Sequence, residues 1–318
     1  MLKSIVFLCI LATIYFCYIL TISSDNEYTN KLEVQQLNLK EYLNLAEYNV
    51  YSGKGTTIAI LDSGISNHSD LNMNNLISFV DFTHDNKEMY DDNGHGTAIT
   101  GIIAGDGEYQ GIAPDTKYII IKVLDEENQA DYNSLMQSIN WILLNHEKYE
   151  IDIINISLGI QSYISHENIS LERKIQEMLD HGLIVVAAAG NSGPYEDTIT
   201  FPGSIPGIIS VEYLNTHHSY DYNDATVAIS SSRGNNINCK PEIYIPAIDM
   251  KVLRKNSGYT IKSGSSFATA VVAGVLSLLL EKFPEFSPDQ IRKELLDNTV
   301  EIDDKSVNCI PKVLFVKS

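Results

Sequence analysis

Five short apolar runs, separated by segments with helical periodicity, constrain the fold more than any other feature of the sequence. Each run is rich in β-branched residues and apolar throughout, which is typical of strands buried on both faces. Two intervening segments, 133–145 and 171–182, carry apolar residues three and four positions apart. Alternation of this kind predicts an α/β fold of three layers, with a mostly parallel central sheet flanked by helices on both faces. The runs are 56–61, 118–124, 151–156, 183–189 and 208–211.

Two further helices are predicted near the C-terminal end. Residues 265–283 form a long apolar segment with small residues early, which favours a buried central helix over a membrane span. In the next segment, Ser287 precedes Gln290 by three positions and Pro288 lies between them. This is the pattern of a helix N-terminus with a capping box, in which Pro occupies the first helical position.

Composition narrows the functional classes. The chain has 318 residues, 44% hydrophobic and 20% charged, which suits one large globular domain with a short additional segment. Its formal net charge is −19. Nucleic-acid binding needs a basic surface, so we expect no nucleic-acid partner. We expect a monomer whose partner is a peptide or protein substrate.

The N-terminal segment predicts export. Residues 5–22 carry no charge, Lys3 precedes them, and Asp25 and Glu27 follow. A positive flank before the apolar run places the rest of the chain outside the cytoplasm. The run exceeds a usual signal core and lacks an Ala-x-Ala cleavage site, which favours an uncleaved anchor, and a cleaved signal peptide is the alternative. The expected division is an anchor or signal over 1–23, a linker over 24–37 and the main domain over 38–318.

The four cysteines do not indicate a metal site. Cys9 and Cys17 lie inside the apolar run, and Cys239 and Cys309 lie in the main domain. Because no CxxC or His/Cys pair at zinc spacing occurs, a structural zinc site is unsupported. One disulfide between Cys239 and Cys309 is allowed by count, and their separation leaves the geometry open.

Three short motifs carry candidate chemistry. Asp62 follows an apolar run and precedes Ser-Gly, His95 lies between two glycines at a predicted helix start, and Ser266 lies where a loop enters a helix. Singly, each has a structural explanation: a strand-end Asp or a Ser often caps a helix, and a lone His is often structural. Together, in the order Asp, His, Ser, they match one of the known orders of the catalytic triad.

The motifs resemble those of the subtilisin-like serine peptidases. The matching segments are Asp62-Ser63-Gly64, His95-Gly96-Thr97 and Gly264-Ser265-Ser266-Phe267-Ala268, and Asn191 follows an Ala-Gly strand end as the oxyanion Asn does in that family. The resemblance runs from about residue 38 to about 300. It implies that Ser266 attacks a peptide carbonyl, that His95 transfers the proton, and that Asp62 orients the imidazole. The Asn191 side chain and the Ser266 N–H would bind the oxyanion.

The resemblance also implies substrate contacts. Ser157, Leu158 and Gly159 match the strand that pairs with the substrate backbone. Tyr132 and Leu135 match the wall of an outer apolar pocket, although core packing is an equal alternative for Leu135 and Leu158. Thr200 stands where the family often has Gly at the floor of the primary pocket.

Several features depart from the family pattern. Ala270 replaces the usual Pro after the nucleophile, and the loop from His95 to Pro114 lacks the long calcium-binding segment of subtilisins. Asp70 matches one calcium ligand of the family, and Asp106 and Glu108 are further oxygen candidates. A tight calcium site takes six to eight oxygens, so we expect no cofactor while leaving calcium open. Because only a short linker separates the apolar run from the domain, we also expect folding without the pro-domain that secreted members of the family carry.

Two alternatives to a serine endopeptidase stay open. The first is an inactive binding protein on the same fold, because a fold by itself does not prove activity. The second is an esterase or transacylase that uses the same triad.

Overall fold

The computed structural model describes all residues except 1–37, 161–165, 236–238, 308 and 315–318. Its centre is a ten-stranded sheet with the order β11-β12-β8-β6-β5-β4-β1-β3-β2, in which β7 pairs with β6. The eight strands from β12 to β2 in this order are joined by parallel pairs, whereas β11 pairs antiparallel with β12 and β7 pairs antiparallel with β6. The strands are β1 Thr57–Asp62, β2 Leu76–Asp81, β3 Lys117–Lys122, β4 Ile153–Ile156, β5 Ile184–Ala188, β6 Ile209–Asn215, β7 Thr226–Val227, β8 Ile243–Pro246, β11 Thr299–Glu301 and β12 Lys312–Leu314.

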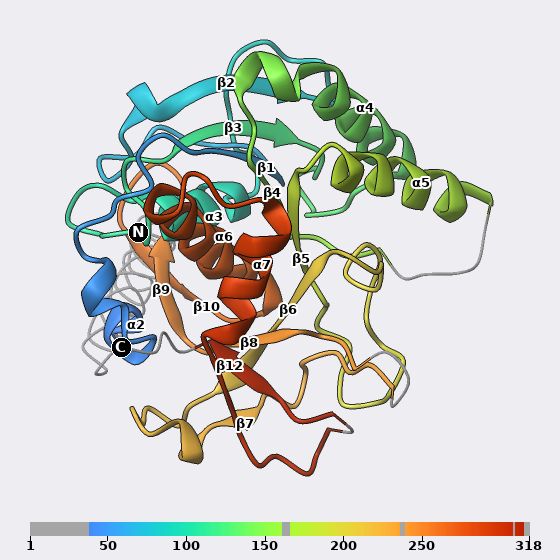
Figure 1. The fold of residues 1–318 in the computed structure, drawn as a ribbon. Coiled ribbons are helices and arrows are strands. Elements are labelled where there is room, and N and C mark those ends of the chain that lie inside the picture. Colours follow the sequence, from blue (N-terminus) through green and yellow to red (C-terminus); the bar gives the residue numbers. More distant parts are fainter. Residues whose placement is uncertain (1–37, 161–165, 236–238, 308, 315–318) are drawn as a thin grey trace, which may run out of the picture. The chain divides into compact units, whose positions relative to one another are not determined.

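Helices cover both faces of this sheet. Figure 1 shows α4 and α5 together on one side, with α3 and α6 on the other. The main helices are α3 His95–Ala104, α4 Tyr132–Tyr149, α5 His166–Asp180, α6 Ser265–Lys282 and α7 Pro288–Asp297. Shorter elements are α2 Leu39–Tyr42, η1 Leu45–Tyr48, η2 Met73–Asn75, η3 Tyr222–Asp224 and the hairpin of β9 Met250–Leu253 with β10 Tyr259–Lys262.

Alternation along β1 explains the two layers of core. Ile58 and Ile60 pack toward the α3 and α6 side, whereas Ala59 and Leu61 pack toward the α4 and α5 side. All four side chains are fully buried. A strand covered on both faces is apolar at most positions, which is why the sequence shows continuous rather than alternating apolar runs. The predicted three-layer α/β fold is therefore confirmed.

The C-terminal helices follow their sequence signals. α6 is long and apolar enough to span a bilayer by composition, but 78% of it is buried inside the described part of the protein, as a core helix would be. Ser287 caps α7, its Oγ accepts the Gln290 N–H, and the Gln290 side chain accepts the Ser287 N–H. The predicted capping box is thus present. The apolar run 5–22 lies outside the described residues, so the anchor and the domain boundary at 38 stay predictions.

Candidate active site

Asp62 is the last residue of β1, at the carboxyl edge of the parallel strands, where α/β proteins place their sites. Its side chain is fully buried. The carboxylate accepts the Ser63 N–H at 2.7 Å and the His95 Nδ1–H at 2.8 and 3.0 Å. Because a buried carboxylate accepts from Nδ1, the imidazole is held with its Nε2 atom directed away from Asp62.

His95 opens helix α3, directly after Gly94, which has a φ of 103°. The imidazole lies 5.3 Å from the Phe267 ring, and its side chain is 13% exposed. Burial lowers the pKa of His95, but the charge of Asp62 and the hydrogen bond to it outweigh burial, and the pKa is raised above its ordinary value. Asp91 raises the pKa further, and Lys262 opposes it.

Two glycines allow the Asp62 and His95 segments to come together. A Cβ on Gly96 would lie 2.1 Å from the Gly64 carbonyl oxygen, and a Cβ on Gly64 would lie 2.0 Å from that of Tyr90. Gly64 also has a φ of 121°, which disfavours any L side chain. Gly64 and Gly96, the glycines of the Asp-Ser-Gly and His-Gly-Thr motifs, therefore allow the two backbone segments to lie in close contact.

Ser266 lies in the first turn of α6, after Gly264 with a φ of 143°. Its backbone N–H is one of the unpaired donors of the helix N-terminus. In this structure its Oγ–H donates to the Ser157 carbonyl at 2.8 Å. The Ser266 hydroxyl is therefore not bonded to His95 here, and catalytic hydrogen bonds are often absent or long in sites without substrate.

Asn191 is exposed and lies beside the start of α6. Its Oδ1 accepts the Ser265 N–H at 3.1 Å and the Ser265 Oγ–H at 3.4 Å. With its oxygen held in this way, the side-chain NH₂ is the end left to donate. Hydrogen bonds thus join the four predicted catalytic residues in two groups. Asp62 is bonded to His95, and Asn191 is bonded to the first turn of α6, which carries Ser266.

The predicted substrate-contact residues differ in their exposure to solvent. Gly159 is exposed, Ser157 and Leu158 are buried, and Tyr132 is half-buried at the start of α4. Leu135 is fully buried in the α4 and α5 layer of the core, where Leu158 also packs. Their part in substrate binding stays a prediction.

Thr200 lies between two backbone segments near the site. Its N–H and Oγ–H both donate to the Ala189 carbonyl, at 2.8 and 3.1 Å. A Cβ on Gly159 would lie 2.0 Å from Thr200 Oγ1, and a Cβ on Gly190 would lie 3.0 Å from its Cγ2. The Thr200 side chain therefore fills the space between these two glycines.

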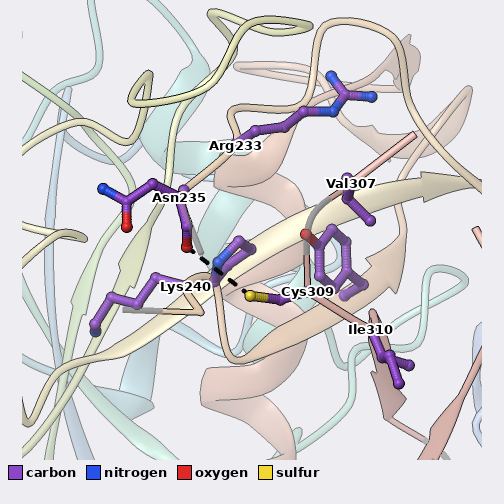
Figure 2. A pocket seen from close by; sticks show the side chains of 9 residues that line it. Arg233, Asn235, Lys240, Val307, Cys309 and Ile310 are labelled. Atoms are coloured by element: carbon purple, nitrogen blue, oxygen red, sulfur yellow. Dashed lines mark hydrogen bonds between the residues drawn. The ribbon is translucent and has the colours of Figure 1, made fainter. Parts of the chain in front are cut away.

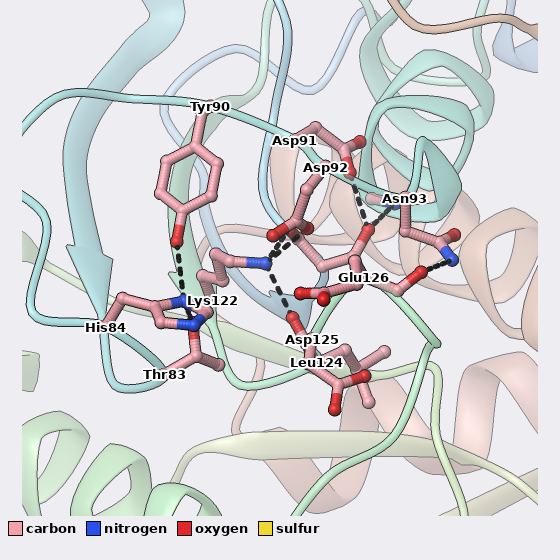
Figure 3. Close-up of polar contacts among 12 residues, drawn as sticks. Thr83, His84, Tyr90, Asp91, Asp92, Asn93, Lys122, Leu124, Asp125 and Glu126 are labelled. Atoms are coloured by element: carbon pink, nitrogen blue, oxygen red, sulfur yellow. Dashed lines mark hydrogen bonds and ion pairs between the residues drawn. The ribbon is translucent and has the colours of Figure 1, made fainter.

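A buried lysine supports the segment after Asp62, and the sequence analysis missed it. Lys122 ends β3, is fully buried, and donates to the carbonyls of Ser63 at 2.8 Å and Leu124 at 2.7 Å. Figure 3 shows its ammonium group between Asp92, at 2.7 Å, and Leu124. The Tyr90 ring centroid lies 4.9 Å from it. The lysine inside an otherwise apolar run could have indicated this role, because a buried cation needs hydrogen-bonding or charged partners.

Cys239 and Cys309 form a disulfide, the pairing that the cysteine count allowed. A small pocket lies beside it, and Figure 2 shows Lys240, Val307 and Ile310 around Cys309. The lining includes none of the four residues assigned to catalysis.

The candidate calcium ligands do not fit that ion in their present arrangement. Asp70 is buried and accepts from the Tyr259 hydroxyl at 2.6 Å and from the N–H groups of Glu108 at 3.2 Å and Tyr109 at 3.1 Å. Glu108 therefore contributes a donor here, and protein donors occupy the carboxylate where a cation would need free oxygens. Within the described residues, no group of three or more His, Cys, Asp or Glu is placed to hold a metal.

The fold and these residues define an α/β protein with an Asp–His pair and a helix-borne serine at one sheet edge. The model of the subtilase family matches residues 53–310, so the chain belongs to the subtilase family. The resemblance read from the motifs is confirmed.

Similar proteins agree with this assignment. Serine protease AprX of Bacillus subtilis (strain 168) is 33% identical over 81% of this chain and 64% of AprX. Subtilisin DY of Bacillus licheniformis is 30% identical over 80% of this chain and 87% of that protein. Minor extracellular protease Epr of Bacillus subtilis (strain 168) is 31% identical, and the chain spans 36% of its length.

Solved structures show the same fold. Sphericase superposes with a TM-score of 0.72 at 27% identity, covering 88% of this chain and 96% of Sphericase. A cold adapted subtilisin-like serine proteinase gives a TM-score of 0.69 at 24% identity, covering 84% and 91%, and that likeness concerns the fold alone.

Proposed function

We propose that the chain is a serine endopeptidase that hydrolyses peptide bonds through an acyl-enzyme. The observation that carries the proposal is the 2.8 Å hydrogen bond from His95 Nδ1–H to buried Asp62, which leaves Nε2 available as a base. Ser266, partly exposed at the N-terminus of α6, is the nucleophile. Family membership and relatives named as proteases support this assignment.

The proposed reaction has two stages. Ser266 Oγ attacks the peptide carbonyl while Nε2 of His95 accepts the hydroxyl proton. The charge that develops on the carbonyl oxygen is stabilised by the Asn191 NH₂ and the Ser266 N–H. His95 then gives its proton to the leaving amine, and the C–N bond breaks to leave an ester on Ser266. Water attacks this ester by the same route in reverse, which releases the acid and restores Ser266.

An open backbone edge supports pairing with an extended substrate. Ile160 and Phe201 exchange both backbone hydrogen bonds, at 2.8 and 3.0 Å, whereas Gly159 just before them makes no backbone–backbone bond within the described residues. Gly159 is also exposed. Peptide substrates commonly bind such an edge by adding a strand.

Thr200 limits the residue before the scissile bond in this proposal. Its side chain fills the space between Gly159 and Gly190, where a pocket for a long side chain would have to open. We therefore expect small to medium side chains at that position. Half-buried Tyr132 favours an apolar residue three positions further upstream.

The test is cleavage-site profiling of a peptide library by mass spectrometry, with Ser266→Ala as the control and an ester panel run in parallel. We expect endoproteolysis that requires Ser266. Cleavage by the Ser266→Ala protein at the wild-type rate would remove Ser266 from the mechanism. Turnover of esters without peptides would favour the esterase alternative, and no labelling by a fluorophosphonate would favour an inactive binding protein.

The location of the enzyme is a separate proposal. The apolar run 5–22 after Lys3 supports export and membrane anchoring, because burial of such a run is effectively permanent. One relative is named as an extracellular protease. Cell fractionation and sequencing of the mature N-terminus test this. Soluble enzyme in the medium that begins near Ser24 would replace the anchor with a cleaved signal.

A further inference from the structure

Asp91, four residues before His95, is a buried carboxylate that accepts four hydrogen bonds. One oxygen accepts the Ser63 Oγ–H at 2.8 Å and the Gly94 N–H at 2.6 Å. The other accepts both the N–H and the Oγ–H of Thr97, at 2.9 and 2.6 Å. Asp91 therefore caps part of the N-terminus of α3, whereas the N–H groups of His95 and Gly96 donate to Asn93 and Ser63.

The same carboxylate ties the His95 helix to the Asp62 segment. Ser63 directly follows Asp62 and donates its hydroxyl to Asp91, and its oxygen accepts the Gly96 N–H at 2.9 Å. Hydrogen bonds through Asp91 and Ser63 therefore link the segment that follows Asp62 to Gly94 and Gly96, the residues on either side of His95. This path runs beside the contact between Gly64 and Gly96.

The charge of Asp91 also acts on the imidazole. The charged groups that face His95 are Asp62 on β1, Asp91 in the preceding loop and Lys262 on β10. Lys255 of the β9–β10 connection packs beside Gly94, and its ammonium group donates to the Asp92 carbonyl. Asp91 is thus the second carboxylate that favours the protonated ring, although it makes no direct contact with it.

We propose that Asp91 is a positioning residue of the catalytic centre: its hydrogen bonds hold His95 in register with Asp62, and its charge stabilises the imidazolium formed during acyl transfer. The inference rests on the proposed triad and adds a positioning side chain to the four residues assigned to catalysis. A displacement of about 1 Å in a catalytic group can cost about 10²-fold in rate, so a brace of this kind affects turnover without touching substrate.

The experiment compares Asp91→Asn with Asp304→Asn in the full chain. Asp304 is a matched control because it accepts the backbone N–H groups of Val227 and Ser306 at 2.7 and 2.8 Å and lies near β7. For Asp91→Asn we expect kcat to fall about 10- to 100-fold with KM changed less than about 2-fold. The acid limb of the pH profile should move to lower pH, because one of the charges that favour the protonated ring is removed. Asp304→Asn should keep the wild-type kcat and acid limb.

A second variant separates the brace from the charge. Ser63→Ala removes the link to Gly96 but keeps the Asp91 charge, so we expect a lower kcat with an unmoved acid limb. It also tests the brace if Asp91→Asn does not fold. The rate of fluorophosphonate labelling is measured across pH for each variant. Each rate is divided by the number of sites that are finally labelled, so unfolded protein does not contribute.

Each failure has its own signature. Wild-type kcat in both Asp91→Asn and Ser63→Ala would overturn the proposal. A lower kcat for Asp91→Asn with an unmoved acid limb would indicate a merely structural role and would overturn it as well. Absence of labelling in the wild-type protein would instead overturn the proposed triad, and the positioning role with it.

Discussion

At the scale of single residues, the proposed mechanism makes activity depend on the protonation state of His95. Burial lowers the pKa of His95, but Asp62 raises it by more, so the pKa lies above the ordinary value. The folded state therefore holds this proton more tightly than the unfolded chain. The resulting stabilisation is fully present below the unfolded pKa of about 6.5 and is lost as the pH rises through the folded pKa. In the proposed mechanism catalysis needs the neutral ring, so activity should be gained over the same pH interval.

The first prediction concerns this pH dependence. The acid limb of kcat/KM should have its midpoint above about pH 6.5 in the wild-type protein. Asp62→Asn should shift that midpoint downward and reduce kcat about 10⁴-fold, the loss found when a triad Asp becomes Asn in a serine protease. Steady-state rates on one peptide from pH 5 to 10 measure both effects. An acid limb that lies below pH 6 in the wild-type protein would contradict the raised pKa.

The second prediction concerns Thr200. Thr200→Gly should raise kcat/KM for peptides with Phe or Tyr before the scissile bond at least about 10-fold relative to Ala, because the space between Gly159 and Gly190 opens. Thr200→Ser keeps the hydroxyl that donates to Ala189 and loses only the methyl group. Its relative kcat/KM for the Phe and Tyr peptides should therefore lie between the values of Thr200→Gly and the wild-type protein. The measurement is competition between the two peptides. A wild-type preference for Phe, Tyr or Lys before the scissile bond would contradict the proposal that Thr200 shortens this pocket.

At the scale of elements, the β9–β10 hairpin is held by hydrogen bonds to His68 and to Asp70, the residue that matches a calcium ligand of the family. His68 Nε2 lies 3.1 Å from the Gly258 carbonyl, and the Tyr259 hydroxyl donates to Asp70. Burial raises the pKa of Asp70, but its hydrogen bonds from Tyr259, Tyr109 and Glu108 together lower it by more, and the net pKa is lowered. This clamp joins the hairpin that leads into α6 to the loop after α3.

The third prediction tests the clamp. Tyr259→Phe keeps the ring under the Lys251 ammonium group and removes only the hydroxyl, so we expect a loss of about 1–3 kcal/mol in the free energy of unfolding. Since the pKa of Asp70 is lowered on folding, the loss should be largest near neutral pH and shrink in acid. Denaturant unfolding at about pH 3, below the ordinary Asp pKa of about 3.9, and at pH 7 measures it, with exposed Tyr195→Phe as the control.

The same clamp predicts the response to chelators. Because protein donors occupy the Asp70 carboxylate, EDTA should leave the thermal midpoint unchanged. A midpoint that falls by several degrees in EDTA and recovers with added calcium would show that a cation displaces these donors.

At the scale of the whole molecule, the Cys239–Cys309 disulfide joins parts of the chain 70 residues apart. Between them lie the β9–β10 hairpin and the two C-terminal helices, and Cys309 precedes β12, which completes one end of the sheet. A cross-link of this span restricts the unfolded chain strongly, on an entropic account.

The fourth prediction follows from that span. Replacement of both Cys239 and Cys309 by Ser should cost about 4 kcal/mol and lower the thermal midpoint by about 10 °C. Residual activity at 25 °C should persist, because the residues around the disulfide pocket include none of the four assigned to catalysis. Thermal unfolding with and without reductant measures the effect. Equal midpoints in both conditions would show that the disulfide contributes nothing to stability.

Local signals explain what the sequence could predict. The five core strands appear within a few residues of their predicted ranges, because burial on both faces leaves a continuous apolar run in the chain itself. The other strands of the central sheet, β2, β7, β8, β11 and β12, were not predicted. Among them, β7, β11 and β12 have only two or three residues each, too few to show a periodicity.

The sequence by itself determined the class of fold, the cap of α7 and the identity of the triad motifs, because periodicity, capping and motif order are written in neighbouring residues. Only the tertiary structure decided the pairing of Cys239 with Cys309, the donors that occupy Asp70, and the burial of Lys122 against the carbonyl of Ser63. It also placed Asp91 between the Asp62 segment and the His95 helix. The physical reason is that a hydrogen bond or disulfide between distant segments depends on where the sheet brings them together, and no local pattern encodes that meeting.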